Sequence, residues 1–213
     1  MGLHILNKQA IEKASFRTYP YKLGTIEHVV HKSYQKQLLA RFPESNFTRV
    51  VKSTQDKSYE MNIRPILKPG SNAIVSASQL DSLWIQLIEE LKSAEYRNLI
   101  STITGISLDD CEVEVNLWKY TNGSNLSVHK DKDEKVVTHL IYMNDIWKDS
   151  WGGHFCIHTE KSQESICEKI LPVVDNSLIL ITTNNSWHSV AAVKPEAHSP
   201  RKGLQIIFKS TSI

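Results

Sequence analysis

The stretch that decides the fold is EVEVNLWKYTNGSNLSVHKDKDEKVVTHLIYM, residues 112–143. Two segments rich in β-branched and aromatic residues, 112–120 and 136–143, flank the turn Thr121-Asn122-Gly123 and the triplet His129-Lys130-Asp131. Apolar runs of this length bounded by Asn and Gly are typical of β-strands. The stretch therefore predicts the start of a β-rich unit that carries polar, chemistry-bearing residues between its strands.

The pattern continues to the C-terminus. Further short β-rich segments, separated by turn signals, occupy residues 153–158, 169–174, 177–182, 187–193 and 203–209. So many short strands without intervening helices favour an all-β sandwich or barrel over alternating β-α-β units. We expect residues 111–213 to form this β core.

The first 110 residues predict a mixed layer that supports the core, within one domain over residues 1–213. The clearest helix is expected over residues 78–99, because leucine and isoleucine recur there at three- and four-residue steps, with Ser78 as N-cap. A second short helix is expected over 100–106, and short strands over 46–51 and 59–66. The fold class is therefore mainly β with a helical N-terminal layer.

Composition excludes several classes of protein. Hydrophobic residues make up 40% and charged residues 23%, which is ordinary for a globular protein, and the net charge of +2 gives no support for a nucleic-acid partner. No apolar run approaches the roughly 18 residues of a membrane span, and residues 1–10 do not resemble a secretory signal. The three cysteines, Cys111, Cys156 and Cys167, form no CxxC motif. We expect a cytoplasmic protein without a membrane partner, and leave its oligomeric state open.

Histidines next to a carboxylate suggest a metal site. In a strand, His129 and Asp131 point to the same face, so both can reach one ion. His-x-Asp is a weak pattern alone, and the best third ligand is His188, within SWHSV at residues 186–190. Two histidines and one carboxylate form the facial triad associated with non-haem Fe(II) oxygenases.

A cation follows the third ligand. Arg201 precedes the apolar strand 204–208, and an arginine fork holds a carboxylate through two parallel hydrogen bonds. Lys202 offers a looser version of the same contact. The alternative interpretation of Arg201 is a solvated loop cation.

Residues 116–208, about half of the chain, resemble the iron(II)- and 2-oxoglutarate-dependent dioxygenases, in particular their prolyl-4-hydroxylase-like branch. The residues that carry this resemblance follow in one order: Tyr120, Gly123, His129, Asp131, Tyr142-Met143-Asn144, Trp147, Gly152-Gly153, His188, Val190 and Arg201.

The resemblance implies a double-stranded β-helix, of the jelly-roll or cupin-like kind, with Fe(2+) held by His129, Asp131 and His188. It also implies 2-oxoglutarate and O2 as cosubstrates, with ascorbate as a candidate stimulant. Arg201 would hold the distal carboxylate of the 2-oxoglutarate molecule together with Tyr142, and Tyr120 and Asn116 would face the same cavity.

The predicted function is hydroxylation of an unactivated C–H bond in a small metabolite or an amino-acid-derived substrate. Two alternatives stay open: a peptidyl, prolyl-type hydroxylase, and a metal-binding barrel without turnover that acts as a sensor. Trp151, Lys130 and His154 are the candidates for the substrate pocket. His139, inside an apolar strand, is expected to be a hydrogen-bonded histidine of the barrel wall.

Overall fold

The structure is a computed structural model that describes residues 2–54 and 57–211. Its α-helices are α1 (Lys8–Glu12), α2 (Lys32–Ala40), α3 (Ser82–Lys92) and α4 (Ala94–Thr104). Its strands are β1 (Ser15–Arg17), β2 (Leu23–Glu27), β3 (Thr48–Ser53), β4 (Ser58–Leu67), β5 (Cys111–Tyr120), β6 (Leu126–His129), β7 (Lys135–Tyr142), β8 (Phe155–His158), β9 (Ile166–Ile170), β10 (Asn176–Ile181), β11 (His188–Val190) and β12 (Arg201–Ser210). Short 3-10 turns lie at Ala77–Gln79, Asp149–Trp151 and Gln163–Ser165.

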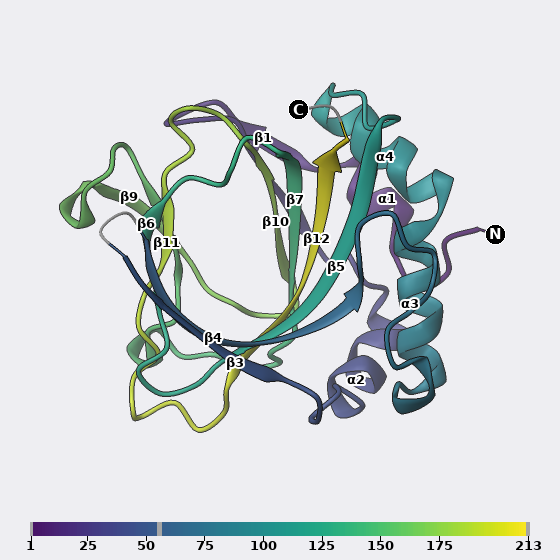
Figure 1. Cartoon of the computed structure of the whole chain (residues 1–213), viewed down its shortest axis with the longest axis horizontal. Coiled ribbons are helices and arrows are strands. Elements are labelled where there is room, and N and C mark those ends of the chain that lie inside the picture. The colour runs from purple at the N-terminus through teal and green to yellow at the C-terminus, as the bar shows by residue number, and fades with distance from the viewer. Residues whose placement is uncertain (1, 55–56, 212–213) are drawn as a thin grey trace.

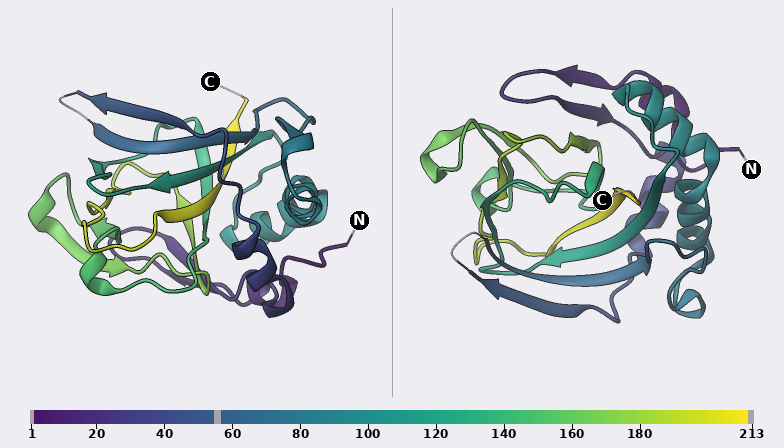
Figure 2. Two further views of the ribbon diagram at one scale, coloured as in Figure 1. Left: turned by 90° about the horizontal axis from the view of Figure 1, so that it is seen from below. Right: turned by 45° about the horizontal axis from the view of Figure 1, so that its top comes forward.

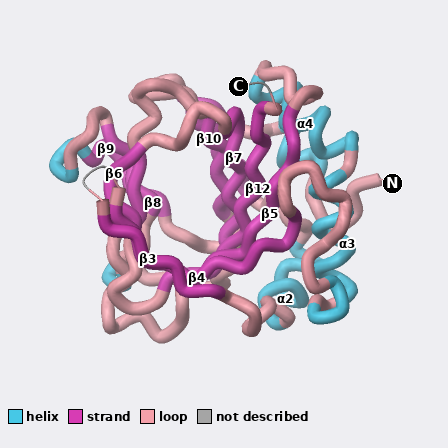
Figure 3. The backbone as a smooth tube through the Cα atoms, viewed as in Figure 1, coloured by secondary structure: helices cyan, strands magenta, loops and turns pink. Residues whose placement is uncertain are grey.

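Two antiparallel sheets lie face to face (Figures 1 and 3). The larger follows the order β1-β2-β10-β7-β12-β5-β4, with β3 on the edge of β4, and the smaller follows β6-β11-β8-β9. The pairing of Tyr59 with Leu126 joins the two. This arrangement is a double-stranded β-helix with a helical layer, which confirms the predicted fold class.

The helices cover one face of the larger sheet, as two further views show (Figure 2). One face of α3 is apolar, and its Trp84, Leu87 and Ile88 are fully buried. They belong to the same core as Val115 and Leu117 of β5. Burial of these side chains at roughly 1.5–3 kcal/mol each holds the helical layer against the sheet. Among the described residues, no helix is long and apolar enough to cross a membrane.

The prediction of one helix over 78–99 is wrong. The chain leaves the helix at Ser93 (ψ 150°), whose hydroxyl accepts a hydrogen bond from the N–H of Tyr96 at 3.1 Å and so begins α4. Asp81, not Ser78, caps α3, because its carboxylate accepts from the N–H of Leu83 at 2.9 Å. Residues 100–106 are not a separate helix but the end of α4, which Gly105 closes with φ of 72°.

The predicted strands are present with shifted bounds. The segment expected at 169–174 is β9, which ends at Ile170 because Pro172 cannot donate to a ladder. The strand expected at 187–193 is shorter, at His188–Val190. β6 was not among the predicted strands, since its four residues are bounded by polar residues.

Alternation along β5 creates a polar interior. Val113, Val115 and Leu117 face the helices, so the residues between them face the space between the sheets. Those include Glu114 and Asn116, polar side chains in a position where a purely structural barrel would place apolar ones. The interior of the barrel is therefore the place to look for a functional site.

Candidate active site

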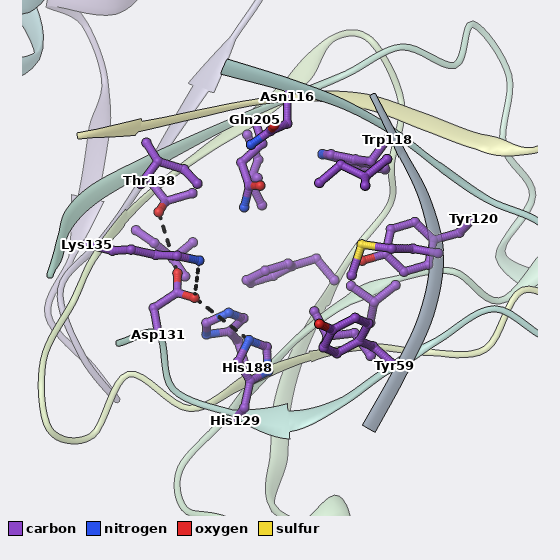
Figure 4. Close-up of a pocket in the computed structure, with 18 of the residues that line it drawn as sticks. Tyr59, Asn116, Trp118, Tyr120, His129, Asp131, Lys135, Thr138, His188 and Gln205 are labelled. Carbon is purple, nitrogen blue, oxygen red and sulfur yellow. Dashed lines mark hydrogen bonds and ion pairs between the residues drawn. The ribbon is translucent and has the colours of Figure 1, made fainter. Parts of the chain in front are cut away.

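Three potential metal ligands meet where β6 and β11 pair. His129 ends β6 and lies directly opposite His188, the first residue of β11, while Asp131 follows two residues after His129. One ligand atom from each of the three lies within 4.8 Å of the others, and all three side chains are buried (Figure 4). Residues distant in the sequence are thus brought together by strand register.

Both imidazoles are oriented by the backbone. Nδ1 of His129 lies 2.9 Å from the carbonyl of Ser127, and Nδ1 of His188 lies 2.9 Å from the carbonyl of Ser186. A carbonyl only accepts, so each Nδ1 carries the proton and each Nε2 keeps a free lone pair. Nε2 of His129 lies 3.9 Å from Oδ1 of Asp131. The free lone pairs are therefore available to an ion beside Asp131.

Burial and nearby charges keep the triad in its ligand form. Burial, reinforced by the neighbouring His188, lowers the pKa of His129 to about 2, so this imidazole is neutral at physiological pH. Burial alone would raise the pKa of Asp131, but Lys135, with Nζ 2.8 Å from Oδ1, and His188 outweigh it, and the pKa lies below its ordinary value. Two neutral nitrogens and one carboxylate fit a divalent metal, and the combination suits Fe(II).

A second feature of the site is a fully buried arginine. Arg201, the first residue of β12, is 1% exposed and donates from Nε to the carbonyl of Gly153 at 2.5 Å. Its guanidinium carbon lies 4.3 Å from the ring centroid of Trp118 and 5.1 Å from those of Tyr120 and Tyr142.

The end of this arginine lacks a partner. One terminal nitrogen of Arg201 and the hydroxyl of Tyr142 have no hydrogen bond to the described part of the chain, although both are buried. Leaving a charged donor buried and unpaired is costly. A carboxylate placed between these two groups would satisfy both, so the residues present fit a bound dicarboxylic acid.

A cavity of about 250 Å³ connects the triad to Arg201. The β3–β4 hairpin closes one side of it with Val50, Lys57, Tyr59, Met61 and Ile63. The inward positions of β5, β7 and β12 continue this wall, and Figure 4 shows several of these side chains directed into the open space. Residues of β6, β8 and β11, which include His129 and His188, line the other side. The cavity is therefore enclosed between the two sheets, with the β3–β4 hairpin as the edge of the larger one.

Some of the predicted site residues line this cavity. Asn116, Tyr120 and Arg201 do, together with the triad, whereas Tyr142 lies behind them against the guanidinium of Arg201. Lys202, the alternative cation, points away and pairs with Glu44, with 2.6 Å between Nζ and Oε1. Of the two cations weighed from the sequence, the structure places Arg201 alone at the cavity.

The three residues expected at the substrate pocket do not line it. Trp151 packs edge-on against Trp147, with 5.3 Å between ring centroids. His154 bonds to Asp149 at 3.0 Å, and Lys130 reaches Asn184 at 3.2 Å. Gly152 and Gly153, which follow Trp151, turn the chain away with φ of 66° each. The wall of the cavity is formed instead by residues that were not predicted from the sequence.

Gln205 and Glu114 are the clearest of these missed residues. Gln205 is a lone polar residue in the run Leu204–Phe208 of β12, and strand alternation places it on the inner face with Arg201. Glu114 alternates in the same way with Asn116 on β5. The sequence signal that could have identified them is a polar residue between apolar neighbours in a predicted strand.

Comparison with known proteins gives two kinds of similarity. Residues 115–208 match the sequence model of the 2OG-Fe(II) oxygenase superfamily. The chain is 27% identical over 176 residues to the prolyl 3,4-dihydroxylase OGFOD1 of Ostreococcus tauri, which covers 78% of this chain and 32% of that protein. The chain therefore spans about a third of the length of this curated relative.

Solved structures share the fold. A prolyl-4-hydroxylase from Pseudomonas putida aligns with a TM-score of 0.64 at 15% identity, over 95% of this chain and 98% of that one. A 2OG-Fe(II) oxygenase family oxidoreductase from Burkholderia pseudomallei aligns with a TM-score of 0.64 at 11% identity, over 98% and 93%. HygX from Streptomyces hygroscopicus, solved with nickel and 2-oxoglutarate, aligns at 0.57 and 11% identity over 90% and 84%.

Proposed function

We propose a function for this chain from the premise that it is a member of the iron(II)- and 2-oxoglutarate-dependent dioxygenase superfamily, on its prolyl-4-hydroxylase-like side. The chain hydroxylates a prolyl residue of a peptide or protein and forms succinate and CO2. The observation that carries this proposal is the buried His129, Asp131 and His188 cluster in one cavity with a buried, half-paired Arg201.

In this function, His129, Asp131 and His188 hold Fe(2+). When bound, the iron with 2-oxoglutarate and dioxygen supplies the oxidising chemistry that places one oxygen atom into a C–H bond of the substrate. The protein prepares the ligands: Ser127 and Ser186 fix the protons of both imidazoles on Nδ1, and Lys135 keeps Asp131 ionised. No ligand then has to lose a proton when the metal binds at neutral pH.

Arg201 binds the distal carboxylate of the 2-oxoglutarate molecule, and the hydroxyl of Tyr142 donates to the same group. One terminal nitrogen of Arg201 and the hydroxyl of Tyr142 are buried without a partner among the described residues, and the faces of Trp118 and Tyr120 hold the guanidinium in place. Because the guanidinium is immobilised before binding, little side-chain entropy is lost when the carboxylate arrives.

The similarity to known proteins changes the substrate expected from the sequence. The sequence favoured a small metabolite, with a peptidyl prolyl residue as the alternative, but the curated relative is a prolyl dihydroxylase and one structural neighbour is a prolyl hydroxylase. We therefore propose the peptidyl substrate. The wall of the cavity contributed by the β3–β4 hairpin combines Tyr59, Met61 and Ile63, apolar surface suited to a pyrrolidine ring.

The test is succinate formation by the purified protein with Fe(II), ascorbate, 2-oxoglutarate and a panel of proline-containing peptides, alongside free proline and other small metabolites. We expect peptide-stimulated succinate and a mass gain of one oxygen atom on proline, both lost in His188→Ala. Stimulation by metabolites alone would favour a small-molecule substrate. Metal binding without any succinate would favour a sensor.

A further inference from the structure

Two carboxamides lie side by side in one wall of the cavity. Asn116 of β5 and Gln205 of β12 are directly opposite partners in the antiparallel ladder, and both line the cavity (Figure 4). Cross-strand partners have Cβ atoms about 4.5–5.5 Å apart, so the two amide groups share one patch of the wall. Neither is needed for the metal ligands or for the pairing of Arg201.

The patch lies apart from Arg201 along β5 and β12. Arg201 pairs with Tyr120, and Gln205 pairs with Asn116, four residues further along the same two strands, which corresponds to about 13 Å. Arg201 and Asn116 are both buried, at 1% and 3% exposed, whereas the side chain of Glu114, the next inward residue on β5, is 20% exposed. The two carboxamides are thus separated from the proposed 2-oxoglutarate anchor, toward the end of the cavity where Glu114 is partly exposed.

The hydrogen bonding of the pair leaves specific groups free. Oε1 of Glu114 accepts from Nδ2 of Asn116 at 2.6 Å, and Oε2 of Glu114 is paired with Nζ of Lys209 at 2.5 Å. This fixes the amide of Asn116, and its carbonyl oxygen has no partner in the described part of the chain. The amide of Gln205 makes no hydrogen bond there, so both its N–H2 and its carbonyl are available.

We propose that Asn116 and Gln205 bind a backbone amide group of the peptide substrate next to the residue that is hydroxylated. A secondary amide offers one N–H and one carbonyl, and the pair offers a fixed acceptor on Asn116 and a donor on Gln205. The neighbouring carboxylate of Glu114 disfavours an anionic group at this position. Because proline has no N–H, the amide that is read belongs to an adjacent residue. This assignment rests on the proposed peptidyl function.

The assignment also separates Asn116 from the cosubstrate-binding role expected for it. As a substrate-binding residue, Asn116 should affect the KM for the peptide and leave the KM for the cosubstrate unchanged. Gln205 should behave in the same way. Arg201 should show the opposite pattern.

The experiment compares amide and ester peptides on the full chain. The probes are acetylated pentapeptides with a central proline and varied neighbours, chosen by stimulated succinate formation, and versions in which one backbone amide at a time is replaced by an ester. The variants are Gln205→Leu and Asn116→Leu, with Gln37→Leu as the control, since Gln37 is exposed on α2. Peptide binding is also measured without dioxygen, by fluorescence anisotropy of the labelled peptide.

We expect one ester position to weaken peptide binding to the unmodified protein about tenfold, the size of a lost hydrogen bond that leaves a buried group unpaired. Gln205→Leu should weaken binding of the all-amide peptide by a similar factor. In this variant the ester substitution should have little further effect on binding, because the two changes remove the same hydrogen bond. Gln37→Leu should change neither value.

Three other results would overturn the proposal. If peptides are hydroxylated but neither variant changes peptide binding, the carboxamide pair has no recognition role while the peptidyl function stands. If Gln205→Leu and the ester weaken binding additively, Gln205 does not contact that amide. If no peptide is hydroxylated and free metabolites are, the peptidyl function fails, and this assignment fails with it.

Discussion

The Nε–H of Arg201 donates to the carbonyl of Gly153, 48 residues earlier in the chain, at 2.5 Å. This bond connects the first residue of β12 to the turn before β8, and so fixes the guanidinium between the two sheets. A Cβ on Gly153 would lie 3.2 Å from Cδ of Arg201, so the glycine also allows this close approach. The proposed anchor is therefore immobilised from both ends before any ligand arrives.

Replacing this anchor should affect one cosubstrate selectively. Arg201→Met keeps most of the buried volume but removes the charged donors, so we expect the Michaelis constant for the cosubstrate 2-oxoglutarate to rise about 10- to 100-fold, as for loss of hydrogen bonds to a charged group. Fe(II) affinity, measured by calorimetry, should change little. Lys202→Met is the matched control, because Lys202 pairs with Glu44 outside the cavity. An equal effect of both variants would contradict the assignment of Arg201.

Loss of one triad carboxylate should remove iron-dependent turnover. Asp131→Ala deletes a ligand and leaves Lys135 without its partner, so we expect Fe(II)-dependent succinate formation to fall more than about 100-fold. Asp133→Ala makes the same charge change on a side chain that is 89% exposed, and should retain turnover. Circular dichroism reports whether Asp131→Ala still folds. A folded and fully active Asp131→Ala protein would refute the ligand assignment.

A methyl group on Gly203 should disturb Arg201 indirectly, through Trp118. A Cβ there would lie 2.2 Å from Cζ2 of Trp118, the ring that stacks on Arg201. Gly203→Ala should cost about 1–3 kcal/mol of unfolding free energy through overpacking, and should weaken the apparent affinity for the cosubstrate as Trp118 shifts. Thermal melting and steady-state kinetics measure the two effects. Gly2→Ala, where the nearest atom lies 4.0 Å away, should show neither.

His139 predicts a pH dependence of stability. Nδ1 of His139 lies 2.6 Å from the hydroxyl of Tyr96, and Nε2 lies 3.2 Å from Oγ of Ser177, which donates to the carbonyl of Ile26. Ser177 therefore accepts from Nε2, Tyr96 donates to Nδ1, and the imidazole is neutral. Burial lowers the pKa of His139 to about 3.

Between about pH 6.5 and 3, the unfolded chain binds a proton at this histidine and the folded protein does not. Stability should therefore fall as the pH falls through this window, with His139 contributing up to about 1.4 kcal/mol per pH unit. His139→Gln should show a shallower slope in urea unfolding measured from pH 7 to 4. His31→Gln, an exposed control, should keep the slope of the unmodified protein. Identical slopes for all three would exclude His139 as a source.

Glu90 should hold the N-terminal segment in place. Its buried carboxylate accepts from the backbone N–H groups of His4 at 2.8 Å, Ile5 at 2.9 Å and Leu6 at 2.9 Å. Glu90→Ala leaves these donors unpaired, and we expect a loss of about 2–4 kcal/mol in chemical denaturation and faster hydrogen exchange at Ile5 and Leu6. Glu89→Ala, which removes a surface pair with Lys92, should cost less than about 1 kcal/mol. Equal losses would mean that the contacts are not stabilising.

The sequence predicted the β core because its strands are local patterns: the apolar runs around β5, β7 and β10 are long and bounded by turn residues. The prediction of a single helix over 78–99 failed because one serine side chain, that of Ser93, ends one helix and begins the next. The residues after Ser93 contain no proline or glycine before Gly105 and continue to favour a helix, yet the serine hydroxyl caps a new helix and breaks the segment into two.

The candidate site divides in the same way. His129 and Asp131 could be proposed together because they are two residues apart, although β6 ends at His129 and Asp131 lies just beyond it. Arg201 could be proposed because it follows His188 and precedes an apolar strand segment. Gln205 and the β3–β4 hairpin could not, because their position at the cavity depends on which strands pair, and pairing is a long-range property. Trp151 was expected at the cavity for its size, but it packs edge-on against Trp147.

One strand, β12, carries both the proposed anchor for the cosubstrate and the carboxamide proposed to read the substrate. The separation between these two contacts is therefore set by the repeat of an extended backbone clamped on both sides by β5 and β7. Such a frame cannot be lengthened gradually, since a shift of one residue would reverse every side chain on it. During evolution, a new substrate is accommodated most directly by exchanging side chains at fixed positions and by reshaping the β3–β4 ribbon at the edge of the same sheet.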